Sequence, residues 1–165
     1  MSNVPASIPP HLAAFAVVVR MLRWLDCIPY ALLALPQRLA AATVFWNSAM
    51  AKLANWDTTI SLFTDDYQVP LLPPELAAYM ATTIELTTPV LLVLGLFTRP
   101  AALVLLAMTA VIEVFVYPQA WPTHIQWAAM LLILLSRGAG SLSIDHLLWR
   151  RFGYLFDGDA RPKTL

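Results

Sequence analysis

Four ionisable residues lie in or beside strongly apolar stretches of this sequence, and their types are suited to chemistry. Glu85 lies inside the stretch ATTIELTTPVLLVLGLFTRP, and Glu113 lies near the end of the apolar stretch that follows. Lys52 closes an earlier apolar stretch, and His124 opens the last one. Carboxylates beside an ammonium or imidazole group can exchange protons and hold polar ligand atoms. We therefore predict Glu85 and Glu113 as catalytic residues and Lys52 and His124 as substrate-binding residues.

Each of these side chains also has a structural interpretation. A charged carboxylate in the middle of a bilayer costs about 2.5–3.5 kcal/mol, so Glu85 is expected to face a polar pocket or to hydrogen-bond a neighbouring helix. A lysine near a helix end commonly extends its ammonium group to the water boundary, which is the alternative for Lys52. His124 follows an aromatic turn and has a place at the interface as its alternative. Arg38 is included among the substrate-binding residues, with a cytoplasmic anchor as its structural role.

Other kinds of site are disfavoured by the sequence. Two carboxylates and one imidazole, from Glu85, Glu113 and His124, suit several divalent ions, but their spacing matches no known ligand motif, and we predict no metal site. A single cysteine, Cys27, cannot close an internal disulfide or form a CxxC pair. We find no motif for haem, flavin or nucleotide, and the net charge of zero gives no sign of a nucleic-acid partner.

The composition places these residues in a membrane protein. Of the 165 residues, 59% are hydrophobic and 12% are charged, and the mean hydropathy is +0.68. Soluble domains are closer to half apolar and a quarter charged. The lipid bilayer is therefore the first predicted partner, and partner proteins or further copies of the chain are the others.

Four segments are long and apolar enough to predict membrane helices, at 30–53, 76–97, 100–116 and 123–135. The last two are short and need their neighbours or a thin bilayer to span. Tight turns between the helices predict an all-α, polytopic four-helix bundle. At the rise of a helix, Glu85 and Glu113 fall within about one turn of each other in height. The predicted divisions are an N-terminal segment, 1–29, the membrane domain, 30–136, and a C-terminal segment, 137–165.

The flanking segments are predicted to lie on the membrane surface. Residues 12–28 mix Arg20, Arg23 and Asp26 with apolar residues, which predicts an interfacial amphipathic helix; a fifth, poor membrane helix is the alternative. The sequence LSIDHLLWRRFGYLF predicts a short juxtamembrane helix near the C-terminus.

The basic residues set the predicted orientation. With four crossings, all the lysines and arginines except Lys52 fall on the side of the two termini, whereas the long loop after Lys52 is acidic. Positively charged loops stay in the cytoplasm. We therefore predict a multi-pass protein of the bacterial inner membrane with both termini cytoplasmic.

Three motifs resemble the DoxX family of small integral membrane proteins. RLAAATVFWNSAMAKL resembles the family's first helix, with an arginine before the apolar stretch and a lysine closing it. YQVPLLPPELAAYMATTIELTTPVLLVLGLFTRPAAL resembles the proline-containing loop, the second helix with its internal glutamate and the GL-x-TR turn, and GAGSLSIDHLL resembles the Ser-x-Asp ending. The resemblance covers about residues 38–148, and Arg38, Lys52, Glu85 and Asp145 match the family pattern. The third helix of the family often has a histidine where this chain has the region of Glu113.

The resemblance implies a four-helix membrane bundle and, from some relatives, a subunit of a thiosulfate:quinone oxidoreductase. Other relatives associate with thiol-handling and oxidative-stress proteins, and the loop variant here resembles a subgroup encoded beside enzymes that modify cysteine-rich, metal-binding peptides. We therefore expect an accessory or subunit of a membrane redox system acting in sulfur, thiol or metal-stress chemistry, with quinone as the candidate cofactor. A small carrier for a metal or sulfur compound and a non-catalytic membrane scaffold are the alternatives. If it is an enzyme, we expect an oxidoreductase subunit and not a complete enzyme.

Overall fold

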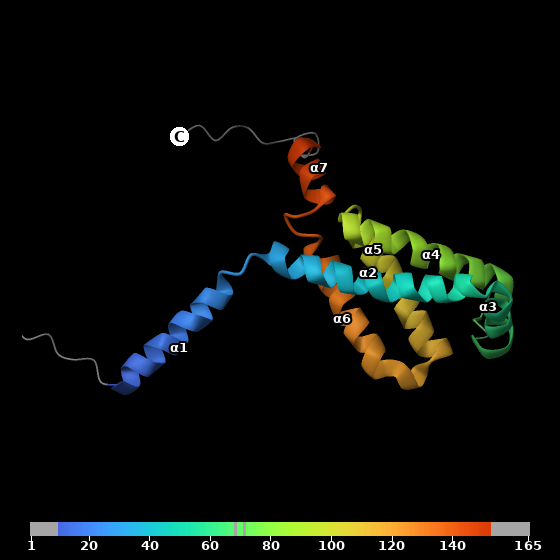
Figure 1. Ribbon diagram of the computed structural model, residues 1–165, viewed down its shortest axis with the longest axis horizontal. Coiled ribbons are helices and arrows are strands. Elements are labelled where there is room, and N and C mark those ends of the chain that lie inside the picture. The colour runs from blue at the N-terminus through green and yellow to red at the C-terminus, as the bar shows by residue number, and fades with distance from the viewer. Residues whose placement is uncertain (1–9, 68, 71, 153–165) are drawn as a thin grey trace, which may run out of the picture.

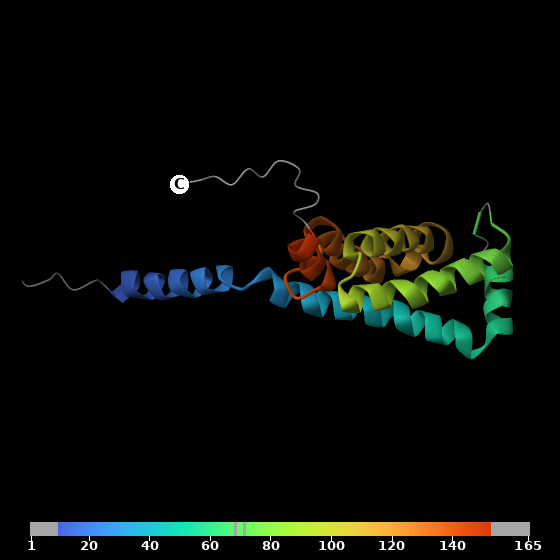
Figure 2. The ribbon, with the colours of Figure 1, turned by 90° about the horizontal axis from the view of Figure 1, so that it is seen from above.

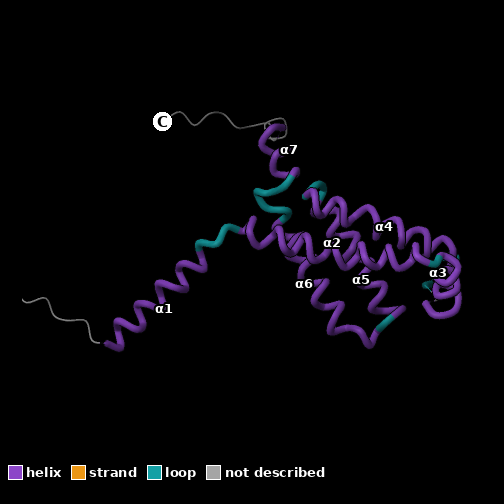
Figure 3. Tube along the Cα trace, in the orientation of Figure 1, coloured by secondary structure: helices purple, strands orange, loops and turns teal. Residues whose placement is uncertain are grey.

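A computed structural model describes residues 10–67, 69–70 and 72–152. In this part of the chain the regular secondary structure is helical, and there are no strands (Figures 1 and 3). The α-helices are α1 (Pro10–Asp26), α2 (Tyr30–Ala54), α3 (Trp56–Leu62), α4 (Pro74–Leu94), α5 (Thr98–Val111), α6 (Trp121–Arg137) and α7 (Ile144–Phe152). Two π-helical segments, η1 (Phe63–Tyr67) and η2 (Ile112–Val116), extend α3 and α5, and a 3₁₀ turn, η3 (Pro118–Ala120), precedes α6.

The helices begin and end where prolines, glycines and polar caps dictate. Pro74 occupies the first turn of α4, where its missing N–H costs nothing. At the other end of α4, Gly95 is left-handed, with φ 64°, and Leu96 donates its N–H to the carbonyl of Leu91, which closes a Schellman motif. This turn leads directly into α5, in agreement with the tight turns expected between the helices.

Helices cover the four predicted segments, as α2, α4, α5 together with η2, and α6, and their ends lie within one turn of the predicted positions. The long loop after Lys52 is more ordered than predicted, because it contains α3 and η1. Asn55 starts α3 by accepting a hydrogen bond from the backbone N–H of Thr58, an N-cap that the sequence analysis overlooked.

Helices α2, α4, α5 and α6 pack against one another and run in alternating directions (Figures 1 and 2). Their contact faces are rich in small side chains, which allow close approach of the helix backbones. The buried alanines include Ala34, Ala41, Ala42 and Ala49 of α2, Ala77 and Ala78 of α4, and Ala101 and Ala102 of α5. Phe45, Leu92, Leu105, Leu131 and Leu134 fill the centre of the core.

The distribution of side chains is that of a protein surrounded by lipid. Many large apolar side chains are exposed on the outside of the helices, whereas Arg38, Glu85 and His124 are buried inside. A soluble monomer rarely exposes so extended an apolar surface. Two helices, Pro74–Leu94 and Thr98–Val116, are long and apolar enough to cross a membrane. α6 has 17 residues against the ~20 that a full crossing requires, and α2 has 25 but carries Arg38 and Lys52.

α1 extends away from the packed helices as a separate rod (Figures 1 and 2). Its exposed side chains include Phe15, Met21, Trp24 and Leu25, together with Arg20 and Arg23. Helix formation here agrees with the prediction for residues 12–28, and its place at the interface stays a prediction.

Candidate functional site

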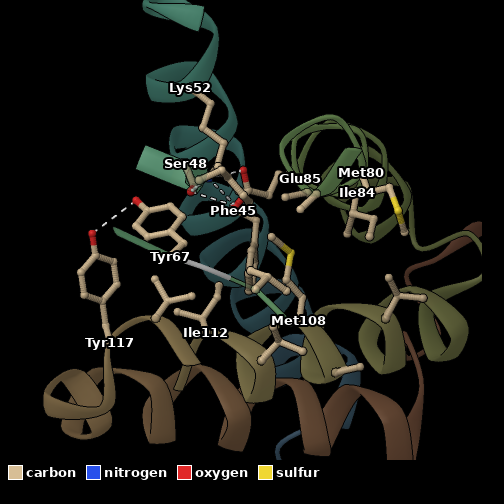
Figure 4. A pocket seen from close by; sticks show the side chains of 18 of the residues that line it. Phe45, Ser48, Lys52, Tyr67, Met80, Ile84, Glu85, Met108, Ile112 and Tyr117 are labelled. Atoms are coloured by element: carbon tan, nitrogen blue, oxygen red, sulfur yellow. Dashed lines mark hydrogen bonds and ion pairs between the residues drawn. The ribbon is translucent and has the colours of Figure 1, made fainter. Parts of the chain in front are cut away.

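Lys52, Ser48 and Glu85 form a closely bonded polar cluster between α2 and α4 (Figure 4). The ammonium group of Lys52 donates to Glu85 Oε1 at 2.9 Å and Oε2 at 2.8 Å, and to Ser48 Oγ at 2.9 Å. Ser48 Oγ in turn donates to Glu85 Oε1 at 2.9 Å. All three N–H groups of Lys52 therefore have an acceptor, and the buried pair of charges is neutral overall.

The helices bring this cluster together for a simple geometric reason. Ser48 and Lys52 are four residues apart, so they lie one above the other on one face of α2. That face packs on α4, where Glu85 is 1% exposed. The Lys52 side chain is 17% exposed and points inward to the carboxylate, so it does not extend to the surface as the structural alternative proposed. The sequence analysis overlooked Ser48, although its spacing to Lys52 carried the signal.

Several threonines lie near Glu85 on α4. The hydroxyl groups of Thr83, Thr87 and Thr88 donate to carbonyl oxygens of their own helix and not to the carboxylate. Such back-bonding satisfies a hydroxyl group locally. Ser48 on the neighbouring helix supplies the hydroxyl donor instead.

A cavity of about 460 Å³ adjoins the cluster, and Ser48, Lys52 and Glu85 form its polar part (Figure 4). Side chains of α2, η1, α4, α5, η2 and α6 line it. The rest of the lining is largely apolar and aromatic: Val44, Phe45, Phe63, Met80, Ile84, Val104, Met108, Ile112 and Trp127 are among its members. A mostly apolar cavity of this size with a few polar groups at one place is typical of a small-molecule site.

Aromatic pairs hold the walls of this cavity. The rings of Phe45 and Trp127 meet edge to face at 5.8 Å, and those of Tyr67 and Tyr117 do so at 5.6 Å. The hydroxyl of Tyr117 donates to that of Tyr67 at 3.3 Å, which links η1 to the end of η2 across the cavity wall (Figure 4). Burial, followed by the contact with Tyr117, raises the pKa of Tyr67. Tyr67 therefore stays neutral at physiological pH, and its role at this site could not be predicted from sequence because the pairing is long-range.

Glu113 and His124 form a second, separate pair. Glu113 lies on η2, and its Oε2 is 2.6 Å from Nδ1 of His124 at the start of α6. The His124 side chain is buried, whereas that of Glu113 is about one-third exposed. His124 lines both the cavity and a neighbouring hollow of about 280 Å³, and Glu113 lines that second hollow. The orientation of the His124 ring is assigned from the contact of its Nδ1 with Glu113 Oε2.

The four ionisable candidates thus form two pairs. Lys52, Glu85 and His124 share the main cavity, but Glu113 reaches it only through His124. In the part of the chain that the structure describes, no three metal-type side chains gather in one place. Glu85, Glu113 and His124 accordingly do not form one ligand set.

Arg38 lies away from the cavity, at the end of the molecule where α7 begins. Its guanidinium is 2% exposed and donates to four backbone carbonyls: Leu92 at 2.7 Å, Val93 at 2.5 Å, Leu142 at 2.7 Å and Ala139 at 3.3 Å. These bonds fasten the end of α4 to the loop before α7. A buried guanidinium that donates to four backbone carbonyls is suited to joining helices, and it lies apart from the other substrate-binding candidates.

Asp145 completes this end of the molecule. Its two carboxylate oxygens accept the backbone N–H groups of Phe97 at 2.8 Å and Thr98 at 2.9 Å, which caps the start of α5 from a distant part of the chain. Its own N–H donates to the carbonyl of Gly95 at 2.8 Å. Phe97 has φ 49°, an unusual value for a residue with a side chain, and this cap supports it.

Comparison with known proteins agrees with these observations. The DoxX family model matches residues 33–118, just over half of the chain, and includes α2, α4 and most of the cavity wall. No curated protein and no solved structure matches the chain. The exposed apolar exterior, the two helices long and apolar enough to span a bilayer, and the family match together identify a membrane protein, and the chain belongs to the DoxX family.

Proposed function

We propose that this chain is a subunit of a redox system in the bacterial inner membrane and that its cavity binds a quinone. The single observation that carries the proposal is the cavity itself: about 460 Å³, walled by apolar and aromatic side chains, with His124 and the Lys52–Glu85 pair on its surface. A quinone has a flat ring, polar oxygens and an apolar tail, so a largely apolar cavity with few polar groups suits it.

In the proposed topology, α2, α4, α5 and α6 form a bundle that crosses the membrane four times. Their alternating directions support this arrangement (Figure 1). Arg99 and Arg137 lie at the end where α7 begins, whereas Lys52 and the acidic Asp57 lie at the opposite end. The positive-inside rule then favours cytoplasmic termini and puts the cavity in the outer half of the bilayer.

His124 is the residue best placed to hold a quinone oxygen. The three N–H groups of Lys52 are already used by Ser48 and Glu85, whereas His124 engages Glu113 through Nδ1 alone. Nε2 is the ring nitrogen left for a ligand, and the contact of Nδ1 with Glu113 fixes the orientation of the ring. The Lys52–Glu85 pair provides a fixed dipole that orients the ligand.

The second pair supplies protons. Glu113 is partly exposed and His124 is buried at the cavity, so the two form a short path from the surface to the ligand. Conversion of a quinone to a quinol takes up two electrons and two protons, and oxidation of two thiols to a disulfide releases two of each. Because Cys27 is the single cysteine, thiol oxidation in this scheme belongs to a partner protein.

Binding of a short-chain ubiquinone to the purified chain in nanodiscs tests this proposal. Trp127 lines the cavity, so we expect quinone to quench its fluorescence, and Trp127→Phe identifies that signal. Loss of a hydrogen bond costs about 0.5–1.5 kcal/mol, so His124→Gln should weaken binding by about 2- to 10-fold. His146→Gln, at the opposite end, is the matched control. Equal affinity of the His124 and His146 variants, or no quenching of Trp127, contradicts the proposal.

A kinetic measurement separates the role of Glu113 from that of His124. Glu113→Gln keeps the shape of the pair but removes the carboxylate, so quinone should still bind. In the complex purified from native membranes with its partner, quinone reduction should slow by at least about 100-fold, the usual contribution of a general acid or base. An unchanged rate would remove Glu113 from the proton path. Uptake of a solute into vesicles by the chain, without any electron acceptor, would favour the carrier hypothesis instead.

A further inference from the structure

A second hollow lies at the opposite end of the molecule, under α7. Its volume is about 1130 Å³, and its walls come from the α4–α5 turn, the end of α6 and α7. It is separate from the cavity described above, and none of the residues assigned to the redox proposal lines it.

One wall of this groove is positively charged. Arg99 and Arg137 both line it and are both exposed. They flank Gly138, because Arg137 precedes it and a side chain at Gly138 would come within 3.5 Å of Arg99 Nε. Arg99 donates to the carbonyl of Ser136 at 3.2 Å, and Arg137 lies over the ring of Tyr30 at 5.6 Å. These two weak contacts hold both guanidinium groups beside the groove.

Neither arginine is neutralised by a carboxylate of the residues that the structure describes. Within the described ranges, no aspartate or glutamate lies at ion-pair distance from Arg99 or Arg137. Asp145 lines the same groove, but both of its oxygens are engaged by the backbone N–H groups that start α5. Two guanidinium groups therefore present unused donors to the groove.

The other wall is apolar. Leu148, Trp149 and Phe152 of α7 line it, and Phe97 lines it from the α4–α5 turn. These side chains are strongly exposed; Trp149 is 65% and Phe97 is 62% exposed. An exposed apolar wall beside two arginines, at one end of the packed helices, suits the boundary where lipid head groups meet acyl chains.

We propose that this groove binds an anionic glycerophospholipid, with its phosphate between Arg99 and Arg137 and its acyl chains along Leu148, Trp149 and Phe152. Guanidinium groups bind phosphate with two parallel hydrogen bonds, which an ammonium group cannot reproduce. Basic pockets between membrane helices on the cytoplasmic side are suited to anionic head groups. The proposal depends on the membrane character of the chain and not on quinone binding.

Native mass spectrometry of the full chain, titrated with phosphatidylglycerol or phosphatidylcholine in a mild detergent, tests this site. We expect saturable binding of one phosphatidylglycerol and weaker binding of phosphatidylcholine. An arginine near an anionic lipid contributes about a fivefold gain in affinity, so Arg99→Gln combined with Arg137→Gln should weaken phosphatidylglycerol binding by about 30-fold. Combined Arg99→Lys and Arg137→Lys substitutions, which keep the charge but lose the planar group, should give an intermediate loss.

The matched control removes the same charge from outside the groove. Arg150 and Arg151 are exposed on α7 but do not line the hollow, so Arg150→Gln with Arg151→Gln should leave the affinity within about twofold. Equal losses in the two double variants would mean general attraction to charge and would overturn the proposal. Displacement of the lipid by millimolar inorganic phosphate would also overturn it, because it would make the site one for a free anion. Unchanged thermal unfolding of the variants confirms that they are folded.

Discussion

Substitution of Lys52 by methionine tests whether the charge pair in the cavity holds α2 to α4. Methionine has nearly the length of lysine, so it keeps the packing while removing the ammonium group. Glu85, which is 1% exposed, would then lose its two bonds from Lys52 at 2.8 and 2.9 Å and keep that from Ser48. A buried carboxylate without a counter-charge is strongly unfavourable.

The size of the effect follows from the burial of the pair. Removing one partner of a buried ion pair costs about 3–5 kcal/mol. Because the Lys52 side chain is 17% exposed and water weakens part of the attraction, we expect the lower end, about 3 kcal/mol. For a chain of this length, 1 kcal/mol corresponds to about 2–4 °C, so the melting temperature should fall by about 6–12 °C.

The decisive comparison is with the double variant. Lys52→Met with Glu85→Gln removes both charges, so it should recover about 2 kcal/mol of the loss, and this coupling measures the pair. Unfolding by sodium dodecyl sulfate in mixed micelles, followed by tryptophan fluorescence, gives the free energies. Arg150→Met, which removes an exposed cation, should have little effect. If the single and double variants were equally stable, the pair would have no role in joining the helices.

Three further predictions concern the scaffold and the cavity wall. Arg38→Met should destabilise the chain by about 3–5 kcal/mol, because it removes the hydrogen bonds of a buried guanidinium to four backbone carbonyls; chemical denaturation measures the loss, and a change below about 1 kcal/mol would contradict the structural role. Gly95→Ala should destabilise by at least about 1 kcal/mol, since Gly95 has φ 64° and a methyl group there would come within 2.5 Å of Ser143 Cβ; thermal unfolding at wild-type level would contradict this close approach. Tyr67→Phe should change the pH dependence of stability: burial raises the pKa of Tyr67 above its usual 10.0 in the folded chain, so the wild type should lose stability as the pH rises beyond about 10, and the variant should lose less. Equal slopes for the two proteins between pH 9 and 11 would show that the phenol is not buried.

The helices could be predicted from the sequence because local signals fix them. Pro74 starts α4, Gly95 ends it, and long apolar stretches set the helix lengths. α3 was overlooked because its signal is a single N-cap, Asn55, in a loop with several acidic residues. An N-cap is a local sequence signal, so the start of α3 was predictable from Asn55.

The four candidate side chains were identified from the sequence, and the structure pairs Lys52 with Glu85 and Glu113 with His124. Height along a helix follows from residue counting, but the direction in which each helix faces does not. The rotation of η2, a π-helical segment, is set by packing and turns Glu113 toward the second hollow.

Arg38 illustrates a different limit. Its motif was recognised, and its side chain was assigned to substrate or to the membrane surface. Its acceptors are backbone carbonyls of Leu92, Val93, Ala139 and Leu142, and the side-chain identities of these residues give no sign of such bonds. The same holds for Asp145, which caps a helix that begins 47 residues earlier in the chain.

Photolabelling with an azido-ubiquinone in native membranes, followed by peptide mass spectrometry, tests the central claim most directly. If quinone occupies the cavity, the label should attach to peptides that contain its lining residues, such as Met80, Met108 and Trp127, and excess unlabelled ubiquinone should abolish it. Label confined to the exposed face of α1, or label unaffected by competitor, would show that quinone contacts the protein from the lipid and not within the cavity.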